Sequence, residues 1–583
     1  MRSAGVPPAV AKVAKVPDPF ASSKRRRLDV SVYMAGFRLL SKNKCHGDNC
    51  GGSFMGRSRL SAAFKRNPAA YVMLLVLGLY FVTRLINLKG VPVFIDESIY
   101  IKWARAAQGG NLWASLLYDG KPPLHSWAMV PLLSLMKDEL LAGRLTSVFF
   151  GGMTTLGLYL TGKELRNWKL GALAAFLYVA CPFTFFYDRM AIAEGMLLTL
   201  FVFAVYFAVK AARSVNSYYL IGAGVCTGLA LLTKGTATLL FLIVPFAYLI
   251  RGPAEKGLEK SRPLVRWLAT SGLALLLGFG ILNLLRFSSQ WAARSTFIAT
   301  RSKNLHEILA TPLRQFLRFN SSIIVNLLTY LTPILLIVAL GGLLIALLKG
   351  WRPGYFLLAW FLLGFVVISL VGKFAWARFY LVLAPPLLLS AAYVFYELWA
   401  FAMRAWVRAG SKRILATASV AVVAGLAIAA AVPAGSLLAG MTRATQGEAD
   451  YLKGRCAGTG MAQTAHILRD ASRHRKIMVV ANDYFIQYAL EMYMPNRRNL
   501  ELTTLDLEYR KGYTALLKST IGEEAREGPT YVIVNGAKNV PSSWHLRVLR
   551  EFVKDKGRSE DSMFVTRVME TPTAHAGVPN RPL

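Results

Sequence analysis

The chain has 583 residues, of which 55% are hydrophobic, and its mean hydropathy is +0.41. A soluble protein of this length could not cover so much apolar surface, so the composition predicts a polytopic membrane protein. The formal charge of +37 does not indicate a nucleic-acid partner, because the basic residues lie mostly in short loops between apolar runs, where they set topology and meet lipid headgroups.

Residues 1–68 are basic and irregular and contain no apolar signal-peptide core, so we expect either a disordered cytoplasmic tail or a mis-assigned start codon with Met55 as the true start. Cys45 and Cys50 enclose His46 in the run CHGDNC. Their spacing matches no standard metal site and no second pair lies nearby, so we predict no metal and no disulfide framework there.

Residues 69–440 are predicted to form the membrane domain, with about eleven transmembrane helices. The apolar runs that are long enough to span a bilayer lie at 69–88, 140–161, 170–187, 193–211, 218–234, 236–251, 266–285, 320–348, 355–372, 379–402 and 413–440.

The basic loops alternate along these runs, and the positive-inside rule places the basic side, with the tail, in the cytoplasm. One loop, 286–318, breaks the pattern, because it falls on the opposite side and yet carries Arg286, Arg294 and Arg301. Binding of an anionic substrate would explain this exception. The same opposite side collects the segments with unusual polar residues at membrane depth, which predicts a shared site on that face.

The first of these segments carries adjacent carboxylates, Asp96 and Glu97, directly after the first apolar run. The sequence DESIYIKWARAAQGG predicts a short amphipathic helix with Asp96 at or near its N-cap. Asp96 is therefore either a helix cap or a general base held at a dry site, and one residue can be both. Lys121 is either a loop cation before a proline-led helix or a phosphate ligand. His125 is either structural or a substrate contact.

Three further segments bring charges to the same face. Arg189 and Glu194 lie at a helix–helix turn. Either they belong to a local ion pair at the membrane surface, or Glu194 contributes a second carboxylate to the site. Lys234 and Arg378 lie at helix ends, and snorkelling toward the headgroups would explain either one alone. Their presence on the face that holds the acids favours a functional cluster.

Residues 441–583 are predicted to form a small α/β domain outside the cytoplasm. KIMVVAND and TYVIVNGA are typical of buried strands, and SMFVTRV of a last strand. AQTAHILRDASR, YFIQYALEMYM and SSWHLRVLREFV have helical spacing. No glycine-rich phosphate motif opens a helix there, so no nucleotide is expected.

At these residues the chain resembles the membrane glycosyltransferases of the GT-C fold, above all the branch with the protein O-mannosyltransferases and the lipid A aminoarabinose transferases (glycosyltransferase family 39 and its bacterial relatives). The likeness rests on five motifs in order over roughly 70–400: the DE pair, GKPPL with a following tryptophan, RMAIAE, GLALLTKG and RFYLVLAPPL. The second acid, often aspartate in the aminoarabinose branch, is Glu194 here.

The resemblance implies an inverting enzyme of the inner (plasma) membrane that takes a sugar from a polyprenyl phosphate at the outer face and passes it to a hydroxyl of a lipid, glycan or protein. It implies Asp96 as the base, Glu194 as a residue that positions the acceptor or tunes Asp96, and Glu97 as an acid that orients the loop. The donor phosphate would be bound by Lys121, Arg378, Arg189 and Lys234. Neither a cofactor nor a metal is required by this chemistry.

Two other classes of protein compete with this interpretation. A secondary transporter would carry its charges at mid-membrane on broken helices, whereas here they lie at helix ends. A non-catalytic scaffold that presents the C-terminal domain would leave the acids and cations on one face unexplained.

Overall fold

The computed structural model describes residues 67–251, 262–310, 312–373, 376–409, 417, 451, 456–495, 499–505, 513–537, 540, 542–554 and 562–569. The expected disordered tail, with Cys45 and Cys50, lies outside the described residues, apart from its last two positions. The expected span at 413–440 also lies outside them, apart from Thr417.

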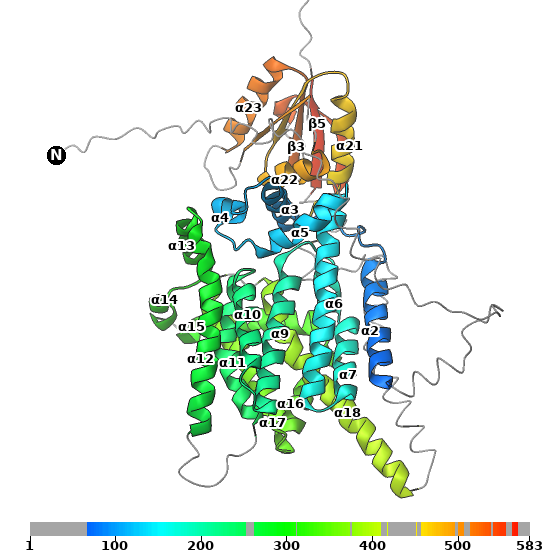
Figure 1. Cartoon of the computed structure of the whole chain (residues 1–583). Coiled ribbons are helices and arrows are strands. Elements are labelled where there is room, and N and C mark those ends of the chain that lie inside the picture. Colours follow the sequence, from blue (N-terminus) through cyan, green and yellow to red (C-terminus); the bar gives the residue numbers. More distant parts are fainter. Residues whose placement is uncertain are drawn as a thin grey trace, which may run out of the picture. The chain divides into compact units, whose positions relative to one another are not determined.

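The part of the described chain up to residue 409 is helical (Figure 1). Five of its helical segments are long and apolar enough to cross a membrane: α2 (Pro68–Leu85), α9 (Ala193–Ser214), α12 (Arg262–Leu282) with η5 (Asn283–Phe287), α17 (Arg352–Val371), and η6 (Ala377–Leu383) with α18 (Ala384–Ala409). A sixth is the bent pair α15 (Pro312–Leu331) and α16 (Pro333–Leu348), if it forms one span. Shorter apolar helices are α5 (Leu124–Leu135), α7 (Trp168–Ala180), α10 (Tyr219–Leu231) and the run η2 (Gly235–Leu239), α11 (Leu240–Phe246) and η3 (Ala247–Ile250).

The other helices of this part are α3 (Ile95–Gln108), α4 (Ala114–Asp119), α6 (Glu139–Leu165), α8 (Pro182–Tyr187), α13 (Trp291–Arg301) and α14 (Leu305–Ala310). The expected helical fold with several membrane-capable helices is confirmed, whereas the number of eleven spans stays a prediction.

Prolines divide two of the apolar runs that were expected to be continuous. The run 320–348 bends by 108° between α15 and α16. Pro333 lacks an amide hydrogen, and the preceding Thr332 takes φ 67° and ψ 146° while its hydroxyl accepts a hydrogen bond from the Leu335 amide. Pro182 likewise opens α8, directly after α7 ends at Ala180.

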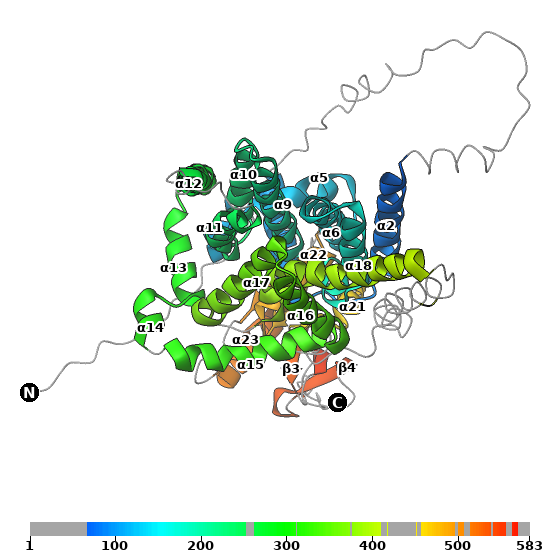
Figure 2. The same ribbon diagram turned by 90° about the horizontal axis from the view of Figure 1, so that it is seen from below.

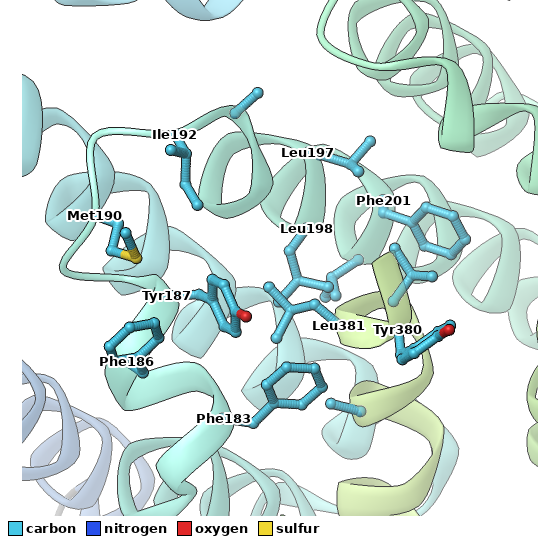
Figure 3. Close-up of a cluster of buried hydrophobic side chains, with 14 of the residues drawn as sticks. Phe183, Phe186, Tyr187, Met190, Ile192, Leu197, Leu198, Phe201, Tyr380 and Leu381 are labelled. Carbon is cyan, nitrogen blue, oxygen red and sulfur yellow. The ribbon is translucent and has the colours of Figure 1, made fainter. Parts of the chain in front are cut away.

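The helices pack in a row, α12, α10, α9, α6 and α2, in which each contacts the next (Figure 2). Close approach of α6 to α9 depends on small residues, since a Cβ at Gly157 would lie 2.9 Å from Val202. Side chains of α8, α9 and η6 share one buried cluster that includes Phe183, Leu198 and Leu381 (Figure 3). This cluster joins the segments that precede Glu194 and follow Arg378.

The C-terminal part contains a five-stranded sheet in the order β2-β1-β3-β5-β4. Its strands are β1 (Ile477–Ala481), β2 (Leu500–Thr504), β3 (Thr530–Ala537), β4 (Leu546–Val553) and β5 (Ser562–Val568). Strands β1, β2 and β3 pair in parallel, and β5 pairs antiparallel with β3 and β4. Helices α21 (Met461–Ala471), α22 (Tyr484–Tyr493) and α23 (Tyr513–Glu527) accompany the sheet.

The three strands expected from the sequence are present, but the helix expected in SSWHLRVLREFV is wrong. Only the short η7 (Ser542–Trp544) is helical, and β4 follows it as an edge strand. Leu546, Val548 and Phe552 fit a helical period and a strand period equally well over so short a run. The antiparallel ladder to β5, which supplies backbone partners along the segment, selects the strand.

Candidate active site

The first loop after α2 leads into α3, the helix that was expected in DESIYIKWARAAQGG. Glu97 stands at the third helical position and accepts a hydrogen bond from the Phe94 amide at 2.9 Å. Asp96, one residue earlier, is not the N-cap itself, which is Phe94. The two adjacent carboxylates therefore leave the helix start in different directions and meet different partners.

Asp96 lies between two cations that come from distant parts of the sequence. Arg378, in η6, donates a hydrogen bond to Asp96 Oδ2. Lys121 Nζ lies 3.9 Å from Asp96 Oδ1 and 2.7 Å from Asp119 Oδ2. The side chains of Asp96, Arg378 and Lys121 are each less than a fifth exposed. Asp96 is thus a largely buried carboxylate with a cation on each side.

Glu194 extends the cluster at the start of α9. Lys234 donates a hydrogen bond to Glu194 Oε1, and Arg378 Nε lies 3.4 Å from the same oxygen. Only 3% of the Glu194 side chain is exposed. Arg378 therefore joins both carboxylates. With Asp119 beside Lys121, three acids and three cations form one continuous network: Asp96, Asp119, Glu194, Lys121, Lys234 and Arg378.

Local structure fixes the position of Lys121. The chain turns at Gly120, which has φ 61°, and the Lys121 amide donates to Ser115 O at 3.1 Å. The ammonium group lies 5.4 Å from the Tyr100 ring centroid and 5.2 Å from that of Trp103, both on α3. Ring faces attract cations, so α3 holds Lys121 beside its own Asp96.

The charge pattern of the cluster acts on the proton affinity of Asp96. Burial alone would raise the pKa of Asp96, but the charges of Arg378 and Lys121, with that of Lys234, outweigh it and hold the pKa well below its usual range. Asp96 is therefore an anion at neutral pH and is stabilised as one.

The structure does not bring Glu97 into this cluster. Its two oxygens accept from Arg144 Nε and Nη2, both at 2.8 Å, and Oε1 also accepts from the Ala191 amide. Arg144 donates further to the carbonyls of Leu88 and Val91. Glu97 and Arg144 are fully buried and tie the first loop to α6 and to the turn before α9.

Arg189 also lies apart from the cluster. Its Nη2 donates to Ile86 O at 2.9 Å and to Asn87 O at 2.6 Å, which are carbonyls at the end of α2. Its guanidinium carbon lies 4.8 Å from the Phe185 ring centroid. Predicted site residues are thus divided: Asp96, Lys121, Glu194, Lys234 and Arg378 come together, whereas Glu97 and Arg189 do not join them.

His125 and Tyr451 lie near the cluster and pack against aromatic rings. His125 is buried on α5, and its ring meets that of Tyr100 edge-on at 5.2 Å. Tyr451 was not singled out from the sequence, because it follows the last apolar run with no motif around it. It is 1% exposed and packs on Phe94, with ring centroids 4.3 Å apart.

Basic residues of the exceptional loop 286–318 occupy α13 and its flanks. The guanidinium carbons of Arg286 and Arg294 lie 5.5 Å and 5.8 Å from the Trp291 ring centroid. Helix α13 packs against α4, which leads to Lys121. Among the residues that the structure describes, no group of three histidine, cysteine, aspartate or glutamate side chains is arranged to hold a metal ion.

Residues 120–281 match the family model described as dolichyl-phosphate-mannose-protein mannosyltransferase, a segment that includes Lys121, Glu194 and Lys234. A comparison with curated proteins finds no match.

Two solved structures share the fold. ArnT from Cupriavidus metallidurans bound to undecaprenyl phosphate is 15% identical, with 85% of this chain and 97% of that chain covered and a TM-score of 0.50. The apo oligosaccharyltransferase of Archaeoglobus fulgidus is 13% identical, with 81% and 70% covered and a TM-score of 0.50. The predicted GT-C fold and the resemblance to the mannosyltransferase and aminoarabinose transferase group are confirmed.

Proposed function

We propose that this chain, a glycosyltransferase of the GT-C fold, moves a sugar from a polyprenyl-phosphate donor to a hydroxyl group of a cell-envelope lipid, glycan or protein, with inversion at the anomeric carbon. The observation that carries the proposal is the position of Asp96 between Lys121 and Arg378. A base and the cations that a leaving phosphate needs are then side by side.

In the proposed reaction Asp96 accepts the proton of the acceptor hydroxyl. The hydroxyl oxygen forms a bond to the anomeric carbon as the bond from that carbon to the donor phosphate oxygen breaks. The electron pair of the broken bond leaves with the lipid phosphate. One displacement on the face opposite the leaving group inverts the anomeric centre, and the acceptor must therefore enter from the side of Asp96.

The phosphate becomes more negative as it leaves, and the clustered cations would stabilise that charge. Arg378 has a planar fork that can hold two phosphate oxygens, while Lys121 and Lys234 act as compact point charges. Preorganised charges of this kind commonly supply the largest share of transition-state stabilisation. No metal step is needed in this account.

The same cations explain how the base is controlled. Arg378 and Lys121 keep Asp96 weakly basic, since they stabilise its carboxylate. A donor phosphate that binds these cations would partly neutralise them and raise the proton affinity of Asp96. Glu194, which shares Arg378 with Asp96, tunes this balance and positions the acceptor. Donor binding thereby prepares the base.

Glu97 and Arg189 take different parts. We assign to Glu97 the orientation of the first loop, because its carboxylate is fully used by Arg144 and two backbone amides. Arg189 was predicted among the phosphate ligands, and its contacts with Ile86 O and Asn87 O support a part in closing the end of α2 instead.

We place the site on the outer side of the inner (plasma) membrane. The positive-inside rule supports this placement, because the short basic loops alternate with the segments that carry the cluster. Residues 456–458 contact the start of α3, so the C-terminal domain and Asp96 share one side. An impermeant thiol reagent applied to single cysteines at exposed positions 111, 474 and 287 should label all three from outside only.

The donor class is supported by the undecaprenyl phosphate in the Cupriavidus structure. The purified chain in nanodiscs, given a radiolabelled polyprenyl-phosphate sugar and a membrane extract, should move label into a new acceptor product. A transporter would take up the labelled compound in vesicles and form no product. Intact donor after prolonged incubation with envelope lipid, glycan and protein fractions would refute the proposed activity.

A further inference from the structure

The C-terminal domain touches the backbone directly before Asp96. Gly458 N donates to Val93 O at 2.7 Å, and Ile95 N donates to Cys456 O at 3.2 Å. These two bonds frame an antiparallel bridge between Phe94 and Ala457. Asp96 follows Ile95, so any displacement of this bridge is passed to Asp96 through one peptide unit.

The bridge is closely packed and requires glycine at position 458. A Cβ there would lie 2.4 Å from Val93 Cγ1 and 2.6 Å from Val93 O, distances that real Cβ atoms do not adopt. Val93, Phe94 and Ala457 are each at most 2% exposed. The two backbones therefore approach more closely than any larger residue at 458 allows.

Tyr451 completes the contact from the same part of the chain. Its ring lies on that of Phe94 and meets Phe186 and Tyr187 edge-on at 5.5 Å and 5.7 Å (Figure 3 shows these two residues). Phe94 in turn lies 5.8 Å from the Arg378 guanidinium carbon. The residue that caps α3 is thus held between the C-terminal segment and the cation that binds Asp96.

The other end of α3 is held by α22. Lys102 Nζ lies 2.9 Å from Glu491 Oε2 and 4.4 Å from the Tyr488 ring centroid. Arg105 donates to Glu491 O at 3.1 Å. On the membrane side, Glu97 and Arg144 fix the same helix to α6. Helix α3 is therefore clamped from two sides, as its place between α22 and the helices below it shows (Figure 1).

We propose that the C-terminal domain is a positioning element of the active site, in which residues 456–458 and α22 hold Asp96 at its distance from Arg378 and Lys121. This rests on the proposed function of Asp96 as the base. Without the bridge, the start of α3 would be fixed on the membrane side alone. Asp96 would then sample positions away from the acceptor hydroxyl, and a misplacement of about 1 Å can cost on the order of 10²-fold in rate.

The test compares Gly458→Val with Gly522→Ala, a substitution in α23 where an added Cβ meets no atom within 4 Å. Gly458→Val should lower kcat by roughly 10²-fold and leave the KM for the donor within about threefold, because Arg378 and Lys234, which would hold the donor phosphate, lie on segments other than α3 and the bridge. Gly522→Ala should behave like the parent in both constants.

Two further readouts separate positioning from general damage. The titratable groups around Asp96 are Arg378, Lys121, Lys234, Glu194, Tyr100 and Tyr451. A carboxylate that moves away from Arg378 regains a higher pKa. The acid limb of the kcat/KM profile should therefore move to higher pH in Gly458→Val. Amide exchange at residues 95–100 should also rise, and this readout needs no activity and so does not depend on the proposed reaction.

If Gly458→Val does not elute as a folded protein, the milder variant Lys102→Met tests the positioning role of the C-terminal domain. It removes the contact with Glu491 at the far end of α3 and should raise exchange along α3 with a smaller loss of kcat. The proposal is overturned if the folded variants keep the kcat of the parent, the acid limb of its pH profile and its amide exchange along α3. Sugar transfer at the parental rate in a variant whose amide exchange has risen would also overturn the proposal. Absence of transfer in the parent protein would count against the proposed function alone.

Discussion

Arg378 donates a hydrogen bond to Asp96 from 282 positions further along the sequence. The same guanidinium lies 3.4 Å from Glu194, so a single side chain connects the first loop, the start of α9 and the segment that leads into α18. In the proposed reaction this side chain passes from the carboxylates to the phosphate of the donor. Its planar shape and its permanent charge both matter for that exchange.

Arg378→Lys separates these two properties. Lysine keeps the charge but cannot contact two oxygens with a planar fork, so donor affinity should fall by about 1–3 kcal/mol and transfer should fall with it. The measurement is donor binding and turnover in detergent. As a matched control, Arg166→Lys changes an arginine that pairs with Glu397, away from the cluster, and should leave both quantities unchanged. Parental donor binding in Arg378→Lys would show that the donor does not use the planar fork of Arg378.

Lys121→Met removes a charge and keeps most of the apolar stem, which lies against Tyr100 and Trp103. The protein should remain folded, while the donor dissociation constant rises about tenfold or more. Lys89→Met is the control, because Lys89 is exposed and pairs with Asp138 outside the cluster. Equal donor affinity in the two variants would show that Lys121 does not bind the donor phosphate and would favour the arginines of 286–318 in its place.

The pH dependence of transfer reports the charge around Asp96. Its folded-state pKa is lowered by Arg378 and Lys121 against the effect of burial, so the carboxylate stays ionised as pH falls through the ordinary range of about 4. The acid limb of kcat/KM that belongs to Asp96 should lie below that range. Loss of the Lys121 charge should raise the pKa and move the limb of the residual activity to higher pH. A limb that moves to lower pH in Lys121→Met would contradict the assignment.

Glu97→Gln should affect stability rather than chemistry. The substitution leaves the buried Arg144 guanidinium without its charged partner, which typically costs about 3–5 kcal/mol. Thermal unfolding in detergent, followed by size-exclusion chromatography, measures the loss. Breaking the exposed pair of Lys89 and Asp138 by Lys89→Met should cost about 1 kcal/mol or less. A Glu97→Gln protein that is as stable as the parent but inactive would show that Glu97 takes a direct part in the reaction.

The sequence predicted the site cluster better than the details around it. Asp96, Lys121, Glu194, Lys234 and Arg378 were expected on one face, because each lies at a helix end and helix ends alternate between two sides. Counting the apolar runs along the chain is enough to make this prediction. The structure places all five in one ion-pair network.

Details that depend on a distant partner could not be predicted in the same way. Nothing local distinguishes Asp96 from Glu97, and their separate environments follow from Arg144, which is buried in an apolar helix. The strand β4 was mistaken for a helix, because its period is ambiguous until β5 pairs with it. The contact of Gly458 with Val93 carries no sequence signal, since it joins two irregular segments.

The most direct test of the account measures a single turnover of Asp96→Asn with the polyprenyl-phosphate sugar already bound. Asparagine preserves the shape of the side chain but cannot accept the proton of the acceptor hydroxyl. The account predicts that donor binding is retained or strengthened, because Arg378 and Lys121 lose a competing carboxylate, while the rate of sugar transfer falls by about 10²-fold or more. Transfer by Asp96→Asn at the rate of the parent enzyme would contradict the role of Asp96 as the base.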